Sequence, residues 1–406
     1  MRFRYTGGMS SDERRILAAA FLRAIGVGAL GVLFALYLSM GGLHVGQIGF
    51  LVACGLAGSA AGTFFVSFFA DRLGRKKTLL LLSGLSALGG LGLALFPGFL
   101  WLAVTVFCGM VNAMGRERGA LYTLEQAILP QTVADSQRTK TLAWYNVILD
   151  IGQAAGSLLG GLPFLLRKTL HVEALFSYQC AFLIYAGLGL ASLFLYMGLT
   201  SKAEIHGPTP WRKVSKESRR RISALSLLFG FDSLAGGFLP SALVAYWFFK
   251  RFGVAEETIA PLFFFAHVAN AFSYLAAAWL AHRIGLVRTM VFTHTPANLC
   301  LIAIPFAPTF AAASILYLVR ECLVEMDVPT RQSYVMAVVE PQARTMAAGV
   351  TNLTRLVAWT FGPTLSGIAM RSMMPGLPLV VGGCLKICYD IALYFSFRHV
   401  KPPEEQ

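Results

Sequence analysis

Charged side chains are scarce in this sequence. Of its 406 residues only 13% are Asp, Glu, Lys or Arg, whereas an ordinary soluble domain carries about 25%. Hydrophobic residues make up 56% of the chain, and its mean hydropathy is +0.64. The shortage of charge excludes a soluble globular enzyme, a disordered chain and a secreted disulfide scaffold, and it indicates a polytopic membrane protein.

Motifs of nucleotide hydrolysis, zinc proteolysis and esterase chemistry are also missing, since there is no Walker loop, HExxH pair or nucleophile elbow. The seven cysteines all fall inside apolar segments without the spacing of metal ligands. That pattern favours packing inside helices. We therefore expect no enzyme activity, no metal site and no cofactor.

Acidic residues are outnumbered, and the formal net charge is +14. Most Lys and Arg side chains outside the apolar runs lie in alternate connecting segments, starting with the N-terminal one. This is the asymmetry of segments that face the cytoplasm. Membrane insertion thus accounts for the positive charge, and we expect no nucleic-acid partner. The asymmetry predicts a multi-pass protein of the cell (inner or plasma) membrane with both termini cytoplasmic.

Long apolar runs dominate what is present. A helix needs about 20 apolar residues to cross a bilayer, and the sequence holds twelve candidates, of which the fourth and tenth are apolar only in their first halves. The runs are 16–39, 46–69, 78–96, 99–128, 141–165, 174–199, 222–249, 258–281, 289–306, 309–338, 346–371 and 377–397.

A polar, basic segment with two prolines, residues 200–221, separates the first six runs from the last six. It predicts an N-terminal six-helix bundle over 1–199, a cytoplasmic linker over 200–221 and a C-terminal six-helix bundle over 222–406. A second interpretation of the same segment is a surface that binds anionic lipid, and the two roles are compatible.

The two halves repeat each other. ADRLGRKKTL at 70–79 matches AHRIGLVRTM at 281–290, and several further matches share one constant offset. Two halves of six helices each run the same way through the membrane, so the repeat is parallel about an axis along the membrane normal. We expect an all-α membrane protein of two pseudo-symmetric bundles. The further matches are Glu125-Gln126 with Arg331-Gln332, Arg138 with Arg344, Asn146 with Asn352, Gly156 with Gly362, and Gly161 with Gly367.

The segment after the second run, Asp71-Arg72-Leu73-Gly74-Arg75-Lys76, resembles the G-x-x-x-D-R-x-G-R-R/K loop of the major facilitator superfamily, with Ser67 in place of the leading glycine. The resemblance implies that fold and a cytoplasmic gate. We expect Asp71 to stand at the start of the third helix, where the helix dipole favours an acid, and Gly74 to allow a tight turn. The alternative is that the charged residues of this loop only set the orientation of the helices in the membrane.

In the fifth run, Gly152, Gly156, Gly160 and Gly161 resemble the glycine motif of the superfamily's proton-driven exporters, with Ser157 in place of its proline. The resemblance implies export by proton antiport. Small residues at this spacing also serve ordinary helix packing in membranes, so the motif supports the exporter interpretation without requiring it.

Ionisable side chains inside the runs are the candidate site. A charge at the bilayer centre costs at least about 2.5–3.5 kcal/mol, so these groups must face one another or a water-filled cavity. The candidates for substrate contact or ion coupling are Arg23, Asn112, Arg116, Arg118, Glu125, Asp232, Arg320, Glu325, Asp327 and Arg331.

Spacing suggests how the candidates group. Arg23 and Asp232 occupy corresponding places in the first and seventh runs, which predicts either a pair or contacts to a shared substrate; a static salt bridge is the alternative. In the fourth run, helical spacing predicts that Asn112 and Arg116 share one face and that Arg118 and Glu125 share another. In the tenth run it predicts a stripe of Arg320, Asp327 and Arg331, with a possible kink at Pro329.

These observations predict a secondary active transporter of a small solute that works by alternating access and is driven by protons, with Glu125, Asp232 and Glu325 as leading proton carriers. The glycine motif favours efflux by antiport. The arginines, whose forked guanidinium suits a carboxylate, favour uptake of an organic anion by symport and an anionic or zwitterionic substrate. A third possibility is a non-transporting membrane protein that kept the fold. We expect a monomer in the bilayer.

Overall fold

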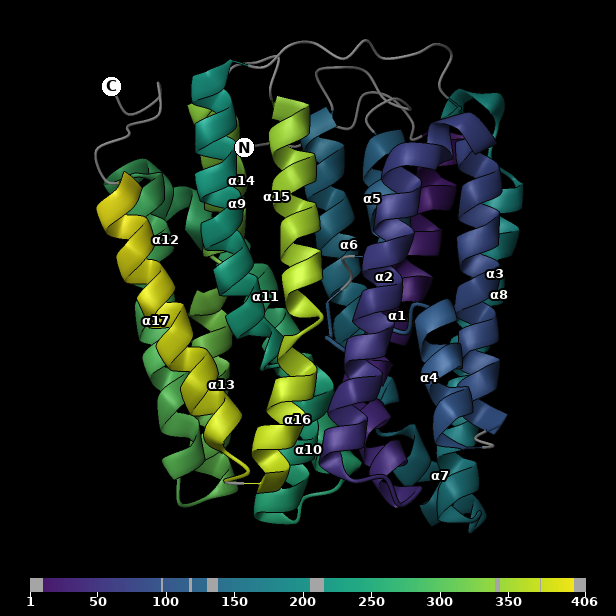
Figure 1. The fold of residues 1–406 in the computed structure, drawn as a ribbon. Coiled ribbons are helices and arrows are strands. Elements are labelled where there is room, and N and C mark those ends of the chain that lie inside the picture. Colours follow the sequence, from purple (N-terminus) through teal and green to yellow (C-terminus); the bar gives the residue numbers. More distant parts are fainter. Residues whose placement is uncertain are drawn as a thin grey trace.

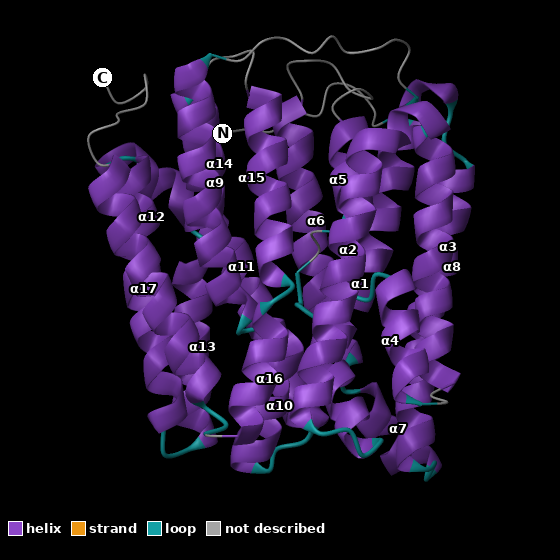
Figure 2. Cartoon of the chain, in the orientation of Figure 1, coloured by secondary structure: helices purple, strands orange, loops and turns teal. Residues whose placement is uncertain are grey.

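The computed structural model describes residues 10–95, 98–116, 119–129, 138–204, 215–339, 344–372 and 374–397. Within these ranges every regular element is a helix, and the helices stand side by side as one bundle (Figures 1 and 2). The predicted all-α membrane fold is confirmed. The first half contains α1 (Ser11–Met40), α2 (Val45–Leu73), α3 (Arg75–Leu95), α4 (Phe99–Cys108), α5 (Ala120–Ile128), α6 (Arg138–Leu159), α7 (Leu162–Leu170) and α8 (Ala174–Met197).

The second half repeats this order after the short helix η3 (Ser201–Ala203), and η4 (Ile304–Phe306) extends its third pass. The bounds of the predicted bundles and linker stay a prediction. The second half contains α9 (Lys216–Gly237), α10 (Ser241–Phe252), α11 (Glu256–Ile284), α12 (Leu286–Ala303), α13 (Phe310–Val324), α14 (Asp327–Val338), α15 (Arg344–Trp359), α16 (Gly362–Ser372) and α17 (Leu377–Phe397).

The helices make twelve passes, as predicted. Nine stretches of the described chain are long and apolar enough to cross a membrane. The passes outside those nine are the fourth (α4, α5), the tenth (α13, α14) and the eleventh (α15, α16). The fourth and tenth are the two in which the sequence is apolar over the first half only, because their second halves carry the charged residues.

Five passes are broken between two helices, namely the fourth, fifth, seventh, tenth and eleventh. In the fourth, Gly109 caps α4 and Gly115 takes a φ of +75°, a left-handed value that glycine adopts without strain. In the tenth, the break lies at Glu325 and Met326 rather than at Pro329, so the predicted kink site is wrong. Pro329 lies in the first turn of α14, where a missing N–H costs little.

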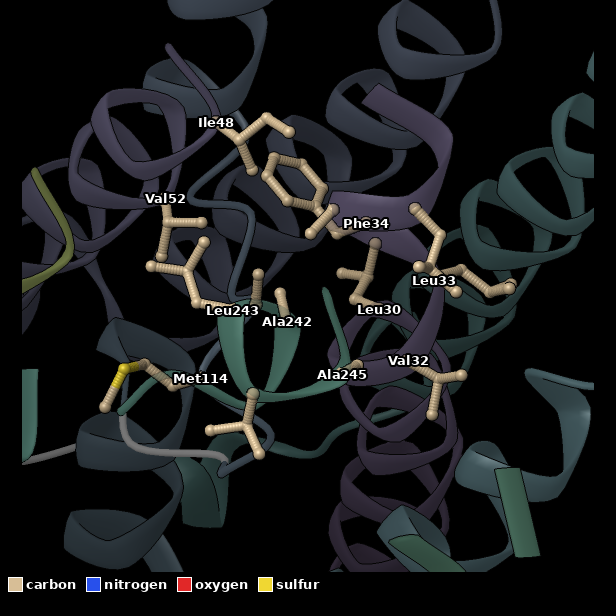
Figure 3. Packing of buried hydrophobic residues seen from close by; sticks show 14 of the residues in the cluster. Leu30, Val32, Leu33, Phe34, Ile48, Val52, Met114, Ala242, Leu243 and Ala245 are labelled. Carbon is tan, nitrogen blue, oxygen red and sulfur yellow. The ribbon is translucent and has the colours of Figure 1, made fainter. Parts of the chain in front are cut away.

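The two halves meet at the end of the bundle opposite the start of α9, which we call the far end; α7, α10 and α16 lie there (Figure 1). One apolar cluster joins Leu30, Leu33 and Phe34 of α1 to Leu243 of α10 (Figure 3). Backbone bonds add to it, since Ala242 N donates to the carbonyl of Ala113 at 3.2 Å. The broken fourth pass is thus hydrogen-bonded to the broken seventh.

Polar contacts also close the far end. Arg167 of α7 forms an ion pair with the buried carboxylate of Glu256 on α11, and Tyr178 donates to the same carboxylate at 3.1 Å. Arg371 of α16 lies 3.0 Å from His44, the residue before α2. Each of these contacts joins one half of the chain to the other.

Glycines bring α6 against α1. A Cβ on Gly156 would lie 2.0 Å from the carbonyl oxygen of Ile25, and Cβ atoms on Gly152 and Gly160 would collide with other atoms of α1. Gly161 lies at the break between α6 and α7. The exporter-like motif therefore acts in helix packing, and its role in coupling stays a prediction.

Gly156→Ala is expected to destabilise the protein by about 1–3 kcal/mol or more, because the added methyl would meet backbone that cannot yield. Gly187→Ala on α8 is the matched control, since nothing lies within 4 Å of its added Cβ, and it should stay within about 1 kcal/mol of wild type. Thermal unfolding in detergent measures both. Equal stability of the two variants would contradict close packing of α1 and α6 at Gly156.

The loop motif is arranged differently from the prediction. Asp71 lies in the last turn of α2, where it accepts from Arg75 Nε at 2.7 Å, rather than at the start of α3. The acid at the start of α3 is Glu204, whose carboxylate accepts from the backbone N–H groups of Arg75 and Lys76 at 2.7 and 3.1 Å. Gly74 makes the turn with a φ of +95°. Arg72 is exposed at the end of α2, and the gate role of the motif stays a prediction.

Candidate functional site

Arg23 of α1 and Glu125 of α5 form a buried ion pair in the first half. The Arg23 guanidinium contacts both carboxylate oxygens, with NH1 3.1 Å from Oε1. Tyr145 donates to the same carboxylate at 2.6 Å, and Tyr196 donates to it as well. Glu125 is 0% exposed. Because the carboxylate is held by a guanidinium and two hydroxyl groups, this arrangement suits a static structural pair.

A polar cavity of about 70 Å³ is lined mainly by the second half, with Met114, Gly115 and Arg116 from the first. Arg23 and Glu125 are not among the residues that line it. Among the described residues its charged lining consists of five basic and four acidic residues, namely Arg116, Arg320, Arg331, Arg355 and Lys386, and Asp232, Glu321, Glu325 and Asp327.

The cavity is narrow. Its volume is below the range of about 300–1,000 Å³ that is typical of pockets holding small-molecule ligands. We therefore expect the walls of the cavity to move apart when a solute binds.

Arg116 extends from the first half to the acids of the second. Its guanidinium contacts Glu325 directly, and NH2 lies 3.5 Å from Glu321 Oε2. Tyr274 of α11 donates to Glu325 at 2.9 Å, and Arg320 pairs with Glu321. The four charged groups line the cavity, so this ion pair joins the two halves at the cavity wall.

The fourth pass does not place Asn112 and Arg116 on one helix face, because α4 ends at Cys108 and α5 begins only at Ala120. Asn112 instead shapes the connection. Its Nδ2 donates to the carbonyl of Arg116 at 2.6 Å, and its Oδ1 accepts from Met114 N at 3.0 Å. The predicted partner of Glu125 on a second face, Arg118, lies outside the described residues.

Asp232 of α9 has two cationic partners. Lys386 of α17 lies 2.6 Å from one carboxylate oxygen, and Arg331 of α14 lies 3.2 Å from the other and 2.8 Å from Asp327. The hypothesis that Asp232 pairs with Arg23 is therefore wrong, since each finds its partners within its own half. The reason is geometric: the fourth pass supplies Glu125 to Arg23, whereas the tenth and twelfth passes supply Arg331 and Lys386 to Asp232.

The repeat places opposite charges at equivalent positions. The first half pairs a basic residue of its first pass with an acid of its fourth, Arg23 with Glu125. The second half pairs an acid with a base in the corresponding passes, Asp232 with Arg331. Only the second pair lines the cavity. The two halves thus share one architecture, but the described cavity lies in the second.

Several polar residues at the cavity are absent from the predicted site, namely Lys386, Arg355, Glu321, His267, Asn270 and His294. Lys386, Arg355 and Glu321 are ionisable residues inside apolar runs, so the sequence alone already marks them as unusual. The imidazole and amide groups carry no comparable signal, because an uncharged polar residue in a membrane helix is common. Contacts between distant passes were needed to find them.

Comparison with known proteins decides the family. The family model described as Major Facilitator Superfamily matches residues 16–383. The chain belongs to the major facilitator superfamily. This major facilitator is 25% identical over 425 residues to the uncharacterized membrane protein YJR124C of Saccharomyces cerevisiae, an alignment that covers 96% of this chain and 95% of the yeast protein.

Solved structures agree with the fold. The xylose transporter XylE from E. coli in a partially occluded inward open conformation matches with a TM-score of 0.74 at 14% identity, covering 98% of this chain and all of XylE. A POT family transporter in complex with 5-aminolevulinic acid matches with a TM-score of 0.75 at 13% identity, covering 96% of each chain. At these identities the likeness shows the fold alone.

Proposed function

We propose that this major facilitator transports a small organic anion together with a proton, and that the cavity of the second half is the binding site. The observation that carries the proposal is the contact of Arg116 with Glu321 and Glu325 across the two halves. Of the described charged residues that line the cavity, Arg116 is the one contributed by the first half.

The charge of the lining supports an anion. Among the described residues that line the cavity, basic residues outnumber acidic ones by one, so an anionic group completes the balance. Arginine suits this role because its planar fork binds a carboxylate through two hydrogen bonds. An anion that takes Glu325's place at Arg116 would still leave the guanidinium paired.

The binding of a proton follows from the replacement of Glu325 by the anion at Arg116. A glutamate that has lost its arginine is a buried, uncompensated charge, which is costly until a proton neutralises it. Anion and proton therefore enter together, which is symport. Movement of the halves about the cavity breaks or remakes the Arg116 contact, and this couples binding to alternating access.

Proton-coupled efflux is the second candidate. The glycine spacing at 152–161 supports it through the resemblance to exporters, although these glycines pack α6 on α1. The two candidates differ in the sign of proton flux. With symport the proton moves in the direction of the solute, and with antiport it moves against it.

The test is a flux measurement on purified protein in liposomes that contain a pH-sensitive dye. Pools of monocarboxylates, dicarboxylates, amino acids and organic cations are added outside. We expect an anionic or zwitterionic pool to acidify the lumen in protein-containing vesicles and not in empty ones. Alkalinisation by a solute that enters would establish antiport. No proton movement with any pool would contradict proton coupling to these solutes.

A further inference from the structure

A histidine and an aspartate form a second buried polar cluster beside the cavity. His294 Nδ1 of α12 lies 2.7 Å from Asp390 Oδ1 of α17, and the two side chains are 2% and 1% exposed. The second oxygen, Oδ2, lies 3.2 Å from both Asn298 Nδ2 and Thr295 Oγ1. His294 also lines the cavity. The cluster thus joins a well-held carboxylate to an imidazole at the proposed binding site.

We infer that His294, oriented by Asp390, binds the transported proton. This inference rests on the proposed function and names a proton site in addition to the glutamates at Arg116. None of the residues predicted from the sequence belongs to the cluster.

The chemistry of the pair favours this role. Histidine is the side chain whose charge changes near neutral pH. Asp390 Oδ1 lies 2.7 Å from Nδ1, and Asn298 Nδ2, which can only donate, lies 3.2 Å from the same nitrogen. When the ring binds a proton, both of its nitrogens carry hydrogen and Nδ1 donates to the carboxylate. The resulting imidazolium is already paired with a carboxylate. A buried imidazolium without that partner would be far more costly.

The charged groups around His294 form ion pairs with one another. On two helices packed against α12 these ion pairs are Arg320 with Glu321 on α13 and Arg331 with Asp327 on α14. Facing them on α17 are Lys386, Tyr389 and Asp390, with Asp232 on α9 beside Lys386; His267 and Tyr274 lie on α11.

A chain of contacts joins His294 to the anion site. Lys386 and Asp390 are four residues apart on α17 and so lie on one face. Lys386 binds Asp232 at 2.6 Å, and Asp232 binds Arg331 at 3.2 Å. A new charge at His294 therefore acts on groups that are already part of the cavity wall.

His171 supplies the matched control. It is an exposed histidine at the end of α7 and is not among the residues that line the cavity. His171→Gln and His294→Gln therefore make the same chemical change away from the cavity and at its wall.

The first test separates coupling from binding in liposomes, with lactate, pyruvate, gluconate and glutamate as probes. We expect His294→Gln to lose at least tenfold of the accumulation driven by a pH gradient and to keep exchange of labelled for unlabelled probe within threefold. Asp390→Asn should show the same split, and His171→Gln should keep both activities. Uphill accumulation by His294→Gln at the wild-type level would overturn the inference. Loss of both activities in a variant that unfolds at the wild-type temperature would overturn it too.

The second test does not depend on transport. Histidine labelled with ¹⁵N in the full-length protein is titrated by NMR from about pH 4 to 9, the range in which imidazole changes charge. We expect one titrating imidazole that is absent from His294→Gln and present in His171→Gln. No such titration would overturn the proton site. If wild type moved no probe in either mode, the proposed function would fail, and the titration alone would decide the proton site.

Discussion

Glu125→Gln is expected to destabilise the protein by about 3–5 kcal/mol, the cost of removing one partner from a buried ion pair. The change leaves the Arg23 guanidinium buried without a counter-charge, and it weakens the hydrogen bonds from Tyr145 and Tyr196. Thermal unfolding in detergent and the yield of monodisperse protein measure the effect.

Asp71→Asn is the matched control for Glu125→Gln. Asp71 also pairs with an arginine, Arg75, but its side chain is 56% exposed, and an exposed ion pair is worth about 0–1 kcal/mol. Each substitution turns one acid into its amide. A loss of stability for Glu125→Gln no larger than for Asp71→Asn would show that the Arg23–Glu125 pair is not a structural element.

Arg116→Gln is expected to lower solute-driven proton uptake at least about 30-fold, since truncating one partner of a desolvated charge pair costs about 2–5 kcal/mol. Glu321 and Glu325 lose their common cation, and an anionic solute loses its contact on the first half. Arg116→Lys keeps the charge without the planar fork, so an intermediate rate is expected. Initial rates in liposomes measure both.

Arg251→Gln serves as the control for Arg116→Gln. It removes an exposed arginine at the end of α10, where the guanidinium lies over the ring of Phe252 and not at the cavity. We expect rates within twofold of wild type. If Arg116→Gln moved protons as fast as Arg251→Gln while both were folded, Arg116 would not belong to the solute site.

The passes could be predicted well from the sequence because hydrophobic run length depends on local composition alone. The charged residues inside the membrane could also be identified from the sequence. Most of them are paired in the structure, since Glu125, Asp232 and Glu325 each contact a cation. Desolvation requires such partners wherever they lie in the chain. It does not say which partner each residue will have.

Partners and breaks could not be predicted, since both depend on contacts between distant passes. The repeat matches Arg23 with Asp232, yet the counter-charge of Arg23 is Glu125 of the fourth pass. Helical spacing placed Asn112 on a face that does not exist, because the pass is unwound there. Glu204 caps α3 from 129 residues beyond Arg75, a relation that no local pattern encodes.

We expect solute and proton to bind in the cavity of the second half and not at the polar cluster of the first. Solute-driven proton movement by equal amounts of folded Arg116→Gln and Glu125→Gln in liposomes tests this. We expect Arg116→Gln to be inactive, whereas the folded fraction of Glu125→Gln should move protons at a rate near that of wild type. The reverse result, an active Arg116→Gln and a folded but inactive Glu125→Gln, would contradict it.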